Sequence, residues 1–207
     1  MSAATPSAAA SPLAAHFDAT RDAARAELFD FLRIPSVSAR SEHDADTRRC
    51  AEWLREAVER AGLTATIEET PGHPIVFGEW RGAPGAPTLL VYGHYDVQPA
   101  EPLELWDSPA FEPAVRDGRI YARGSVDDKG QLFLHVKALE AHLKTAGALP
   151  VNVVLVAEGE EEVGSEHLEG WVTANRERLA CDAVVISDSA MFAPGVPSIL
   201  SSLRGMA

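Results

Sequence analysis

The chain has 207 residues, 46% of them hydrophobic, and a formal net charge of −13. This length and composition allow one large globular domain, or two small ones, with a substantial core. The negative charge argues against nucleic acid as a partner, since binding a phosphate backbone requires a basic face. No run reaches the ~18 apolar residues of a membrane span, so we expect no association with a membrane.

The cysteines and the N-terminus both point to a cytoplasmic protein. Cys50 and Cys181 form neither a disulfide framework nor a CxxC pair, which fits a reducing compartment. Residues 1–15 are rich in Ala, Ser and Pro, but they lack the basic start and uninterrupted apolar run of a signal peptide. We predict that they form a disordered tail.

The first half of the chain carries patterns that predict packing elements without chemistry. Apolar residues at helical spacing predict helices over residues 20–32 and 44–61, which Pro35 and Gly62 would end. Two strand-like runs follow at residues 64–68 and 75–80.

A short apolar strand at residues 88–92 is followed at once by His94 and Asp96. Two positions apart in extended chain, the two side chains point the same way. The Asp96 carboxylate can therefore accept one imidazole N–H and fix which nitrogen faces a metal. A single His after a strand is more often structural, but this spacing and position favour a ligand.

The next polar loop contains the pair Asp127-Asp128, with Gly124 before it and Gly130 after it. The glycines allow sharp turns and close approach to a ligand. Adjacent carboxylates repel each other unless a cation holds them, although solvated turn residues are the common alternative. Gly130 then opens a predicted helix over residues 130–143.

The run 151–157 is apolar on both faces, as expected of a central parallel strand, and leads into four carboxylates within residues 158–162. Read alone, such a run is usually a solvated face. After a buried strand, however, its mutual repulsion needs an offset, which a dinuclear metal centre would supply. A helix at residues 166–178 and a strand at 183–187 then lead to Asp188.

This alternation predicts an α/β fold with a mainly parallel sheet flanked by helices, in which ligands gather at the carboxyl ends of the strands. Five side chains are expected to converge there: His94, Asp127, Glu161, Glu162 and Asp188. One imidazole among carboxylates suits zinc better than magnesium or calcium. Two ions roughly 3.5–4 Å apart would activate a bridging water and polarise a carbonyl, which indicates hydrolysis. One of the adjacent glutamates would ligate while the other transfers the proton.

Three motifs now carry a family resemblance: YGHYDVQP (residues 92–99), ARGSVDDKG (122–130) and EGEEEVGS (158–165). They resemble, in order, the signatures of the di-zinc metallopeptidase family that contains aminoacylase, glutamate carboxypeptidase, desuccinylase and the carnosine-type dipeptidases. The HYDVQP form is most similar to the dipeptidase branch. Serine-hydrolase GxSxG and single-zinc HExxH motifs are absent.

The resemblance implies a role for each site residue. His94 and Asp188 would hold one zinc, Glu162 the other, and Asp127 would bridge them across a cis Asp127–Asp128 peptide. Glu161 would be the general base and Asp96 would orient His94. Manganese or cobalt are possible substitutes for zinc.

The resemblance also implies a zinc-aminopeptidase-like catalytic domain that is incomplete at its C-terminus. Residues 16–201 would be its N-terminal part and residues 202–207 the start of a lid and dimerisation domain. The family takes a further His, on the second zinc, from later in a longer chain, and the parent protein would be a homodimer.

The expected activity is hydrolysis of dipeptides or short peptides by a water bridging two zinc ions. Two alternatives stay open: an N-acyl amino acid amidohydrolase of the same family, and a catalytically incompetent metal-binding fragment. We expect the 207 residues alone to be inactive.

Overall fold

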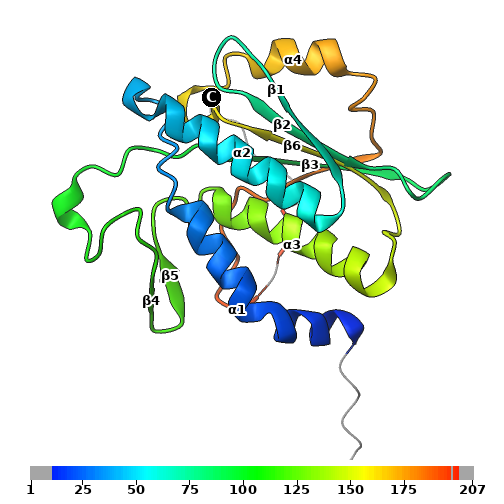
Figure 1. Ribbon diagram of the computed structural model, residues 1–207, viewed down its shortest axis with the longest axis horizontal. Coiled ribbons are helices and arrows are strands. Elements are labelled where there is room, and N and C mark those ends of the chain that lie inside the picture. The colour runs from blue at the N-terminus through cyan, green and yellow to red at the C-terminus, as the bar shows by residue number, and fades with distance from the viewer. Residues whose placement is uncertain (1–10, 197, 201–207) are drawn as a thin grey trace, which may run out of the picture.

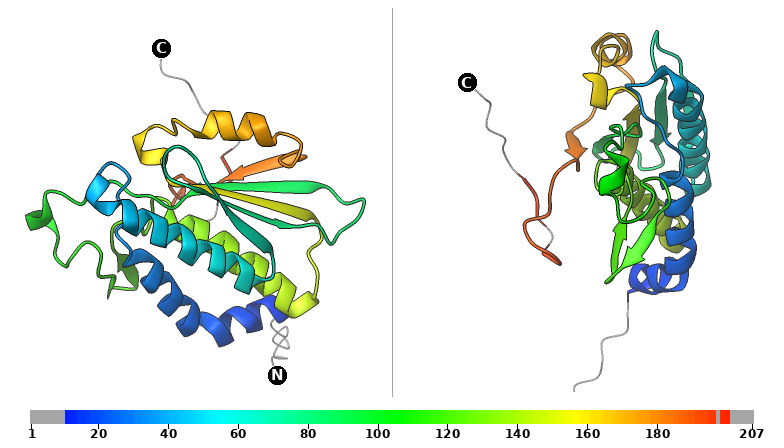
Figure 2. Two further views of the ribbon diagram at one scale, coloured as in Figure 1. Left: turned by 45° about the horizontal axis from the view of Figure 1, so that its top comes forward. Right: turned by 90° about the vertical axis from the view of Figure 1, so that its left-hand side faces the viewer.

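The computed structural model describes residues 11–196 and 198–200. Within them, one sheet lies between helices α1, α2 and α3 on one face and helix α4 on the other (Figures 1 and 2). The helices are α1 (Pro12–Leu32), α2 (Asp44–Ala61), α3 (Lys129–Ala146) and α4 (Leu168–Asn175). The strands are β1 (Thr64–Glu68), β2 (Ile75–Trp80), β3 (Thr88–His94), β4 (Ala114–Arg116), β5 (Arg119–Tyr121), β6 (Asn152–Glu158) and β7 (Ala183–Ile186).

The main sheet has the strand order β1-β2-β6-β3-β7. Strand β2 is antiparallel to both of its neighbours, whereas β6, β3 and β7 are parallel to one another. The register pairs His94, the last residue of β3, with Glu158, the last residue of β6. The predicted α/β class with a mainly parallel, helix-flanked sheet is confirmed. Because β3, β6 and β7 are parallel, the loops that follow them all begin at the same end of the sheet, which we call its carboxyl edge.

Most predicted elements are present, with shifted ends. Helix α2 and strands β1 and β2 have the predicted bounds, while β3 continues to His94 and α4 is shorter than residues 166–178. Helix α1 begins at Pro12 and not at residue 20, because Ser11 caps it by accepting the Ala14 N–H at 3.2 Å. Residues 12–15, predicted as tail, are therefore helical.

The predictions for the two ends of the chain lie partly or wholly outside the residues that the structure describes. Residues 1–10 of the predicted tail and residues 202–207, the predicted start of a lid, fall outside the described residues. Strands β4 and β5 form a separate hairpin that is not among the elements predicted above.

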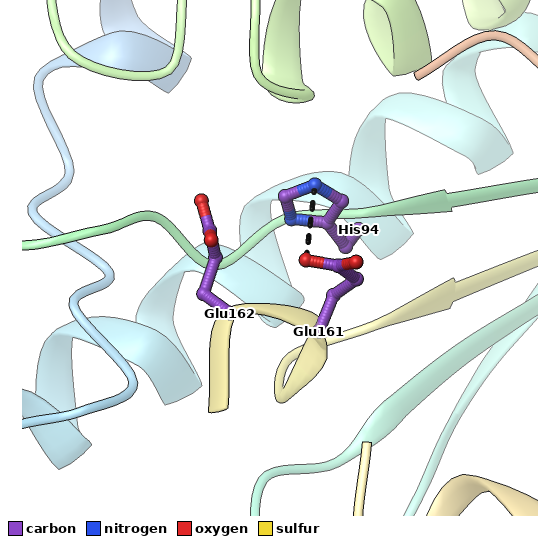
Figure 3. Close-up of side chains that lie close together, drawn as sticks. All are labelled: His94, Glu161 and Glu162. Atoms are coloured by element: carbon purple, nitrogen blue, oxygen red, sulfur yellow. Dashed lines mark ion pairs between the residues drawn. The ribbon is translucent and has the colours of Figure 1, made fainter. Parts of the chain in front are cut away.

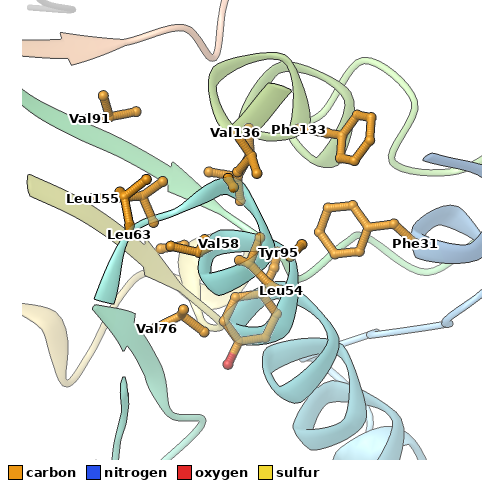
Figure 4. Packing of buried hydrophobic residues seen from close by; sticks show 14 of the residues in the cluster. Phe31, Leu54, Val58, Leu63, Val76, Val91, Tyr95, Phe133, Val136 and Leu155 are labelled. Atoms are coloured by element: carbon orange, nitrogen blue, oxygen red, sulfur yellow. The ribbon is translucent and has the colours of Figure 1, made fainter. Parts of the chain in front are cut away.

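Strand β6 is the centre of the hydrophobic core because its two faces pack on opposite layers. Val153, Leu155 and Ala157 join the cluster beneath α1, α2 and α3, whereas Val154 and Val156 join the cluster beneath α4. Figure 4 shows the first cluster, in which Leu155 lies near side chains from the helices and neighbouring strands. Burial of each of these valine and leucine side chains contributes about 1.5–3 kcal/mol.

Among the described residues, none of the helices is long and apolar enough to cross a membrane.

Truncation of the central strand should be costly. We expect Leu155→Ala to lower the free energy of unfolding by about 2–5 kcal/mol, because Leu155 is fully buried and its loss leaves a cavity. Leu134→Ala is the matched control, since Leu134 is 68% exposed on α3 and should change stability by less than about 0.5 kcal/mol. Urea denaturation of both variants measures the difference, and equal losses would contradict this account of the core.

Candidate metal centre

Four segments from separate parts of the chain bring polar side chains to the carboxyl edge of the sheet. His94 ends β3, Asp127 precedes α3, Glu161 and Glu162 follow β6, and Asp188 follows β7. Their potential ligand atoms form two groups, each with all atoms within 4.8 Å of one another. One group is His94, Asp127 and Asp188, and the other is His94, Glu161 and Glu162. The structure thus brings together all five residues that the sequence predicted to converge.

The His94 imidazole is fully buried and lies at the centre of both groups. Its Nε2 is 3.2 Å from Asp127 Oδ1, 3.7 Å from Asp188 Oδ2 and 3.9 Å from Glu161 Oε2. Figure 3 shows the Glu161 carboxylate beside the imidazole ring, with Glu162 next to it on the same turn. Among the described residues this buried nitrogen has no hydrogen-bond partner. A buried nitrogen without a partner, facing several carboxylates, fits a cation ligand.

Asp96 lies behind the imidazole, but the hydrogen-bond partner of His94 Nδ1 is the Asp96 main-chain oxygen and not the carboxylate that the spacing predicted. His94 Nδ1 is 3.1 Å from the Asp96 main-chain oxygen and 3.3 Å from its Oδ1. Asp96 Oδ2 accepts the Ser38 hydroxyl at 2.6 Å and the Glu162 N–H at 3.1 Å. An N–H on Nδ1 leaves the Nε2 lone pair facing the carboxylates, so Asp96 fixes both the ring and the turn that carries Glu162.

The charges in the centre strongly perturb one another. Burial alone would lower the pKa of His94, but its hydrogen bond to Asp96 and the charges of Asp96, Asp128 and Glu161 outweigh burial and raise the pKa to about 10. Burial raises the pKa of Glu161 and of Glu162, with nearby carboxylates adding to the effect. A bound cation would relieve both the desolvation and the repulsion.

Asp128 bonds to the main chain at His94, whereas its neighbour Asp127 faces the imidazole. Its buried carboxylate accepts the His94 main-chain N–H at 3.2 Å, and burial, opposed by His94, raises its pKa to about 7. A Cβ on Gly93 would come within 2.6 Å of Asp128 Oδ2, so a larger residue there would displace this carboxylate. The Asp127–Asp128 peptide bond is cis, as the resemblance implied.

The acidic run after β6 divides into two pairs, which corrects the expectation that all four carboxylates need an offset from metal. Glu158 accepts hydrogen bonds from the Tyr92 hydroxyl and, at 2.9 Å, from the Ser165 hydroxyl. Glu160 Oε2 is 2.8 Å from His167 Nδ1, and its Oε1 accepts a main-chain N–H. Only Glu161 and Glu162 face His94.

Gln98 is a site residue that the sequence analysis did not single out. Its side-chain amide donates to Glu162 Oε2 at 2.7 Å and to the Glu162 main-chain oxygen at 3.2 Å. Its place in the same motif as His94 and Asp96 was the available signal. Gln98 therefore restrains one of the adjacent glutamates.

Fold and site together define the class of protein: an α/β domain with a candidate metal centre at the carboxyl ends of its parallel strands. Comparison with known proteins narrows this further. The sequence profile of Peptidase family M20/M25/M40 matches residues 90–199, more than half of the 207 residues. The chain belongs to this family, whose members include metallopeptidases that bind divalent metal.

Individual relatives agree with this assignment. The cysteinylglycine-S-conjugate dipeptidase of Corynebacterium striatum is 33% identical over 181 residues, which cover 86% of this chain and 40% of that protein. The structure of an M20 family metallo-carboxypeptidase from Sulfolobus solfataricus is 39% identical, with a TM-score of 0.74 over 81% of this chain and 38% of that one. Human carnosine dipeptidase 1 is 27% identical, with a TM-score of 0.82 over 89% of this chain and 42% of that one. The chain thus spans about two fifths of the length of these relatives.

The link between Asp96 and His94 generates a testable consequence. We expect Asp96→Ala to weaken zinc binding by roughly 10–100-fold. The Glu162 turn and Ser38 lose the carboxylate that they share, and the imidazole loses its 3.3 Å contact with Oδ1, although it keeps the main-chain oxygen as a partner. Asp107→Ala removes an exposed carboxylate and serves as the control. Isothermal titration with zinc compares the two variants with the unmodified chain, and an unchanged affinity in Asp96→Ala would exclude this role.

Proposed function

We propose that this chain is the metal-binding part of a hydrolase that cleaves the peptide bond of dipeptides or short peptides. One observation carries the proposal: two groups of carboxylates share a single buried imidazole at the carboxyl edge of the sheet. The names of the relatives support the choice of bond, because a dipeptidase from Corynebacterium striatum, a human carnosine dipeptidase and a carboxypeptidase from Sulfolobus solfataricus are all peptidases.

The ligand assignment combines the two groups with the family resemblance. His94, Asp127 and Asp188, which form one group, would hold one metal. Glu162, from the other group, would hold the second metal together with Asp127, whose bridging role is what the resemblance implies. Nitrogen and oxygen donors of this kind suit zinc, and manganese or cobalt would substitute. When bound, such ions polarise a scissile carbonyl and make a water more acidic.

The restraints on the adjacent glutamates support a division of tasks between them. Glu162 is held by Gln98, as a ligand should be, whereas the Glu161 side chain is 38% exposed and has no comparable hydrogen bond among the described residues. Glu161 would accept the proton of the attacking water and deliver it to the leaving amine.

Paired substitutions of the two glutamates test this division. In the full-length protein, we expect Glu161→Gln to keep its metal content and lose about 10²–10⁴-fold in kcat, the usual contribution of a general base. Glu162→Gln should lose metal from one position. Elemental analysis and kinetics on a dipeptide substrate measure both properties, and metal loss in Glu161→Gln would reverse the two roles.

The stoichiometry of the chain itself is a separate test. Among the described residues, the two ligand groups share the His94 imidazole, so we expect one tightly bound zinc per chain and weak occupancy of the second position. We also expect no turnover near the ordinary value of about 10 per second. Elemental analysis and a panel of dipeptides and N-acyl amino acids with excess zinc or manganese provide the measurement.

The outcomes of that panel separate the competing activities. Two tightly held ions with ordinary turnover would contradict the expected incompetence of these residues alone. In the full-length protein, cleavage of N-acyl amino acids but not of dipeptides would replace the peptidase with an amidohydrolase.

A further inference from the structure

Lys129 is a fully buried lysine next to the centre, and its amine does not point into it. It follows Asp127 and Asp128 in the chain and is the first residue of α3. Its Nζ donates to the main-chain oxygens of Phe31, at 3.1 Å, and Ile34, at 2.7 Å. The same nitrogen lies 5.0 Å from the centre of the Phe31 ring. The amine therefore grips the C-terminal end of α1.

The segment that Lys129 grips also holds the chain around His94. We call residues 31–38 the brace. Its Ser36 hydroxyl donates to the Tyr95 oxygen at 2.6 Å, and the Ser36 oxygen accepts the Val97 N–H at 2.9 Å. Its Ser38 hydroxyl donates to Asp96 Oδ2 at 2.6 Å. The brace is thus bonded on one side to the segment that carries His94 and on the other to Lys129.

The loop that carries Asp127 is folded closely over the lysine. A Cβ on Gly124, where φ is +81°, would lie 3.3 Å from Lys129 Cδ. A Cβ on Gly130 would come within 2.1 Å of the Ser125 oxygen, and the Gly130 N–H donates to the Gly124 oxygen at 3.1 Å. The Gly130 contacts hold the loop to the start of α3, and Gly124 packs against the Lys129 side chain. We therefore expect a displacement of the Lys129 side chain to reach the loop through Gly124.

We propose that Lys129 is a positioning residue, which sets Asp127 relative to His94 by tying the Asp127 loop to the brace. As a statement about metal binding, this rests on the proposed function; as a statement about loop geometry, it does not. A buried charge is a poor way to gain stability, whereas it can specify one arrangement of the groups around it.

The first experiment needs no metal. Hydrogen exchange of the metal-free chain is measured for Lys129→Met, which keeps an unbranched side chain one heavy atom shorter but removes the three donors of the amine. We expect the N–H groups of Ser125 and Gly130, both hydrogen-bonded within the loop, to exchange at least about tenfold faster than in the unmodified chain. Val58→Ala is the control, because Val58 is buried on α2 beside Gly78, so its truncation removes core packing without removing a bond to the brace or the loop.

The second experiment uses cobalt and zinc as probes. Lys129→Met should change the visible spectrum of bound cobalt and weaken zinc binding by roughly 10–100-fold. Val58→Ala should lose thermal stability while it keeps both the spectrum and the affinity. A merely structural lysine would behave like Val58.

The possible results separate this proposal from the proposed function. Unchanged loop exchange in Lys129→Met overturns the positioning role, whatever the metal data show. Faster loop exchange in a chain that binds no metal supports the positioning role and refutes the proposed function. If Lys129→Met does not fold, Ser36→Ala weakens the opposite side of the brace: an altered cobalt spectrum supports the proposal, and an unchanged spectrum and affinity overturn it.

Discussion

The repulsion among carboxylates around one buried imidazole is the constraint on which this molecule depends. His94 has no exposed surface, and its Nε2 lies within 4 Å of three carboxylates from three different segments. Because the carboxylates that face His94 repel one another, each segment that carries one must be held by contacts on the side away from the centre. Asp96, Asp128 and Lys129 act on that rear side, each by bonding to main-chain or side-chain atoms of another segment.

Much of the fold and of the site could be predicted because both depend on short sequence patterns. Apolar runs predicted the central strands, and the polar residues directly after them had to leave from one edge of a parallel sheet. The hairpin of β4 and β5 and the start of α1 were missed, although the sequence carries a local signal for each. Asp117 and Gly118 have φ angles of 50° and 74°, which fits the tight hairpin turn that an Asp-Gly pair favours. Ser11 followed by Pro12 is a helix start that the Ala-rich composition of the tail obscured.

What could not be predicted depends on contacts between segments far apart in the chain. The sequence shows four acidic residues after β6, but nothing local tells that Tyr92 and Ser165 bind Glu158, or that His167 lies beside Glu160. In the sequence the four carboxylates look alike, and only their tertiary hydrogen bonds show which of them face His94. The partners of Lys129 lie 95 and 98 residues away, at the end of a helix that looked like simple packing.

The pairing of His94 with Glu158 places the spacing of the centre under the control of the sheet's interior. Because β6 packs on both faces, inserting or deleting one residue within it would exchange its two sets of side chains and shift the following turn by about 3.3 Å. Changes in length should therefore be tolerated in the hairpin of β4 and β5, which lies outside the main sheet, and rejected in β3 and β6. The length of the apolar strands β3 and β6 therefore sets the positions of the polar side chains that follow them. Among related sequences, the number of residues in these strands should vary less than the identity of their individual aliphatic side chains.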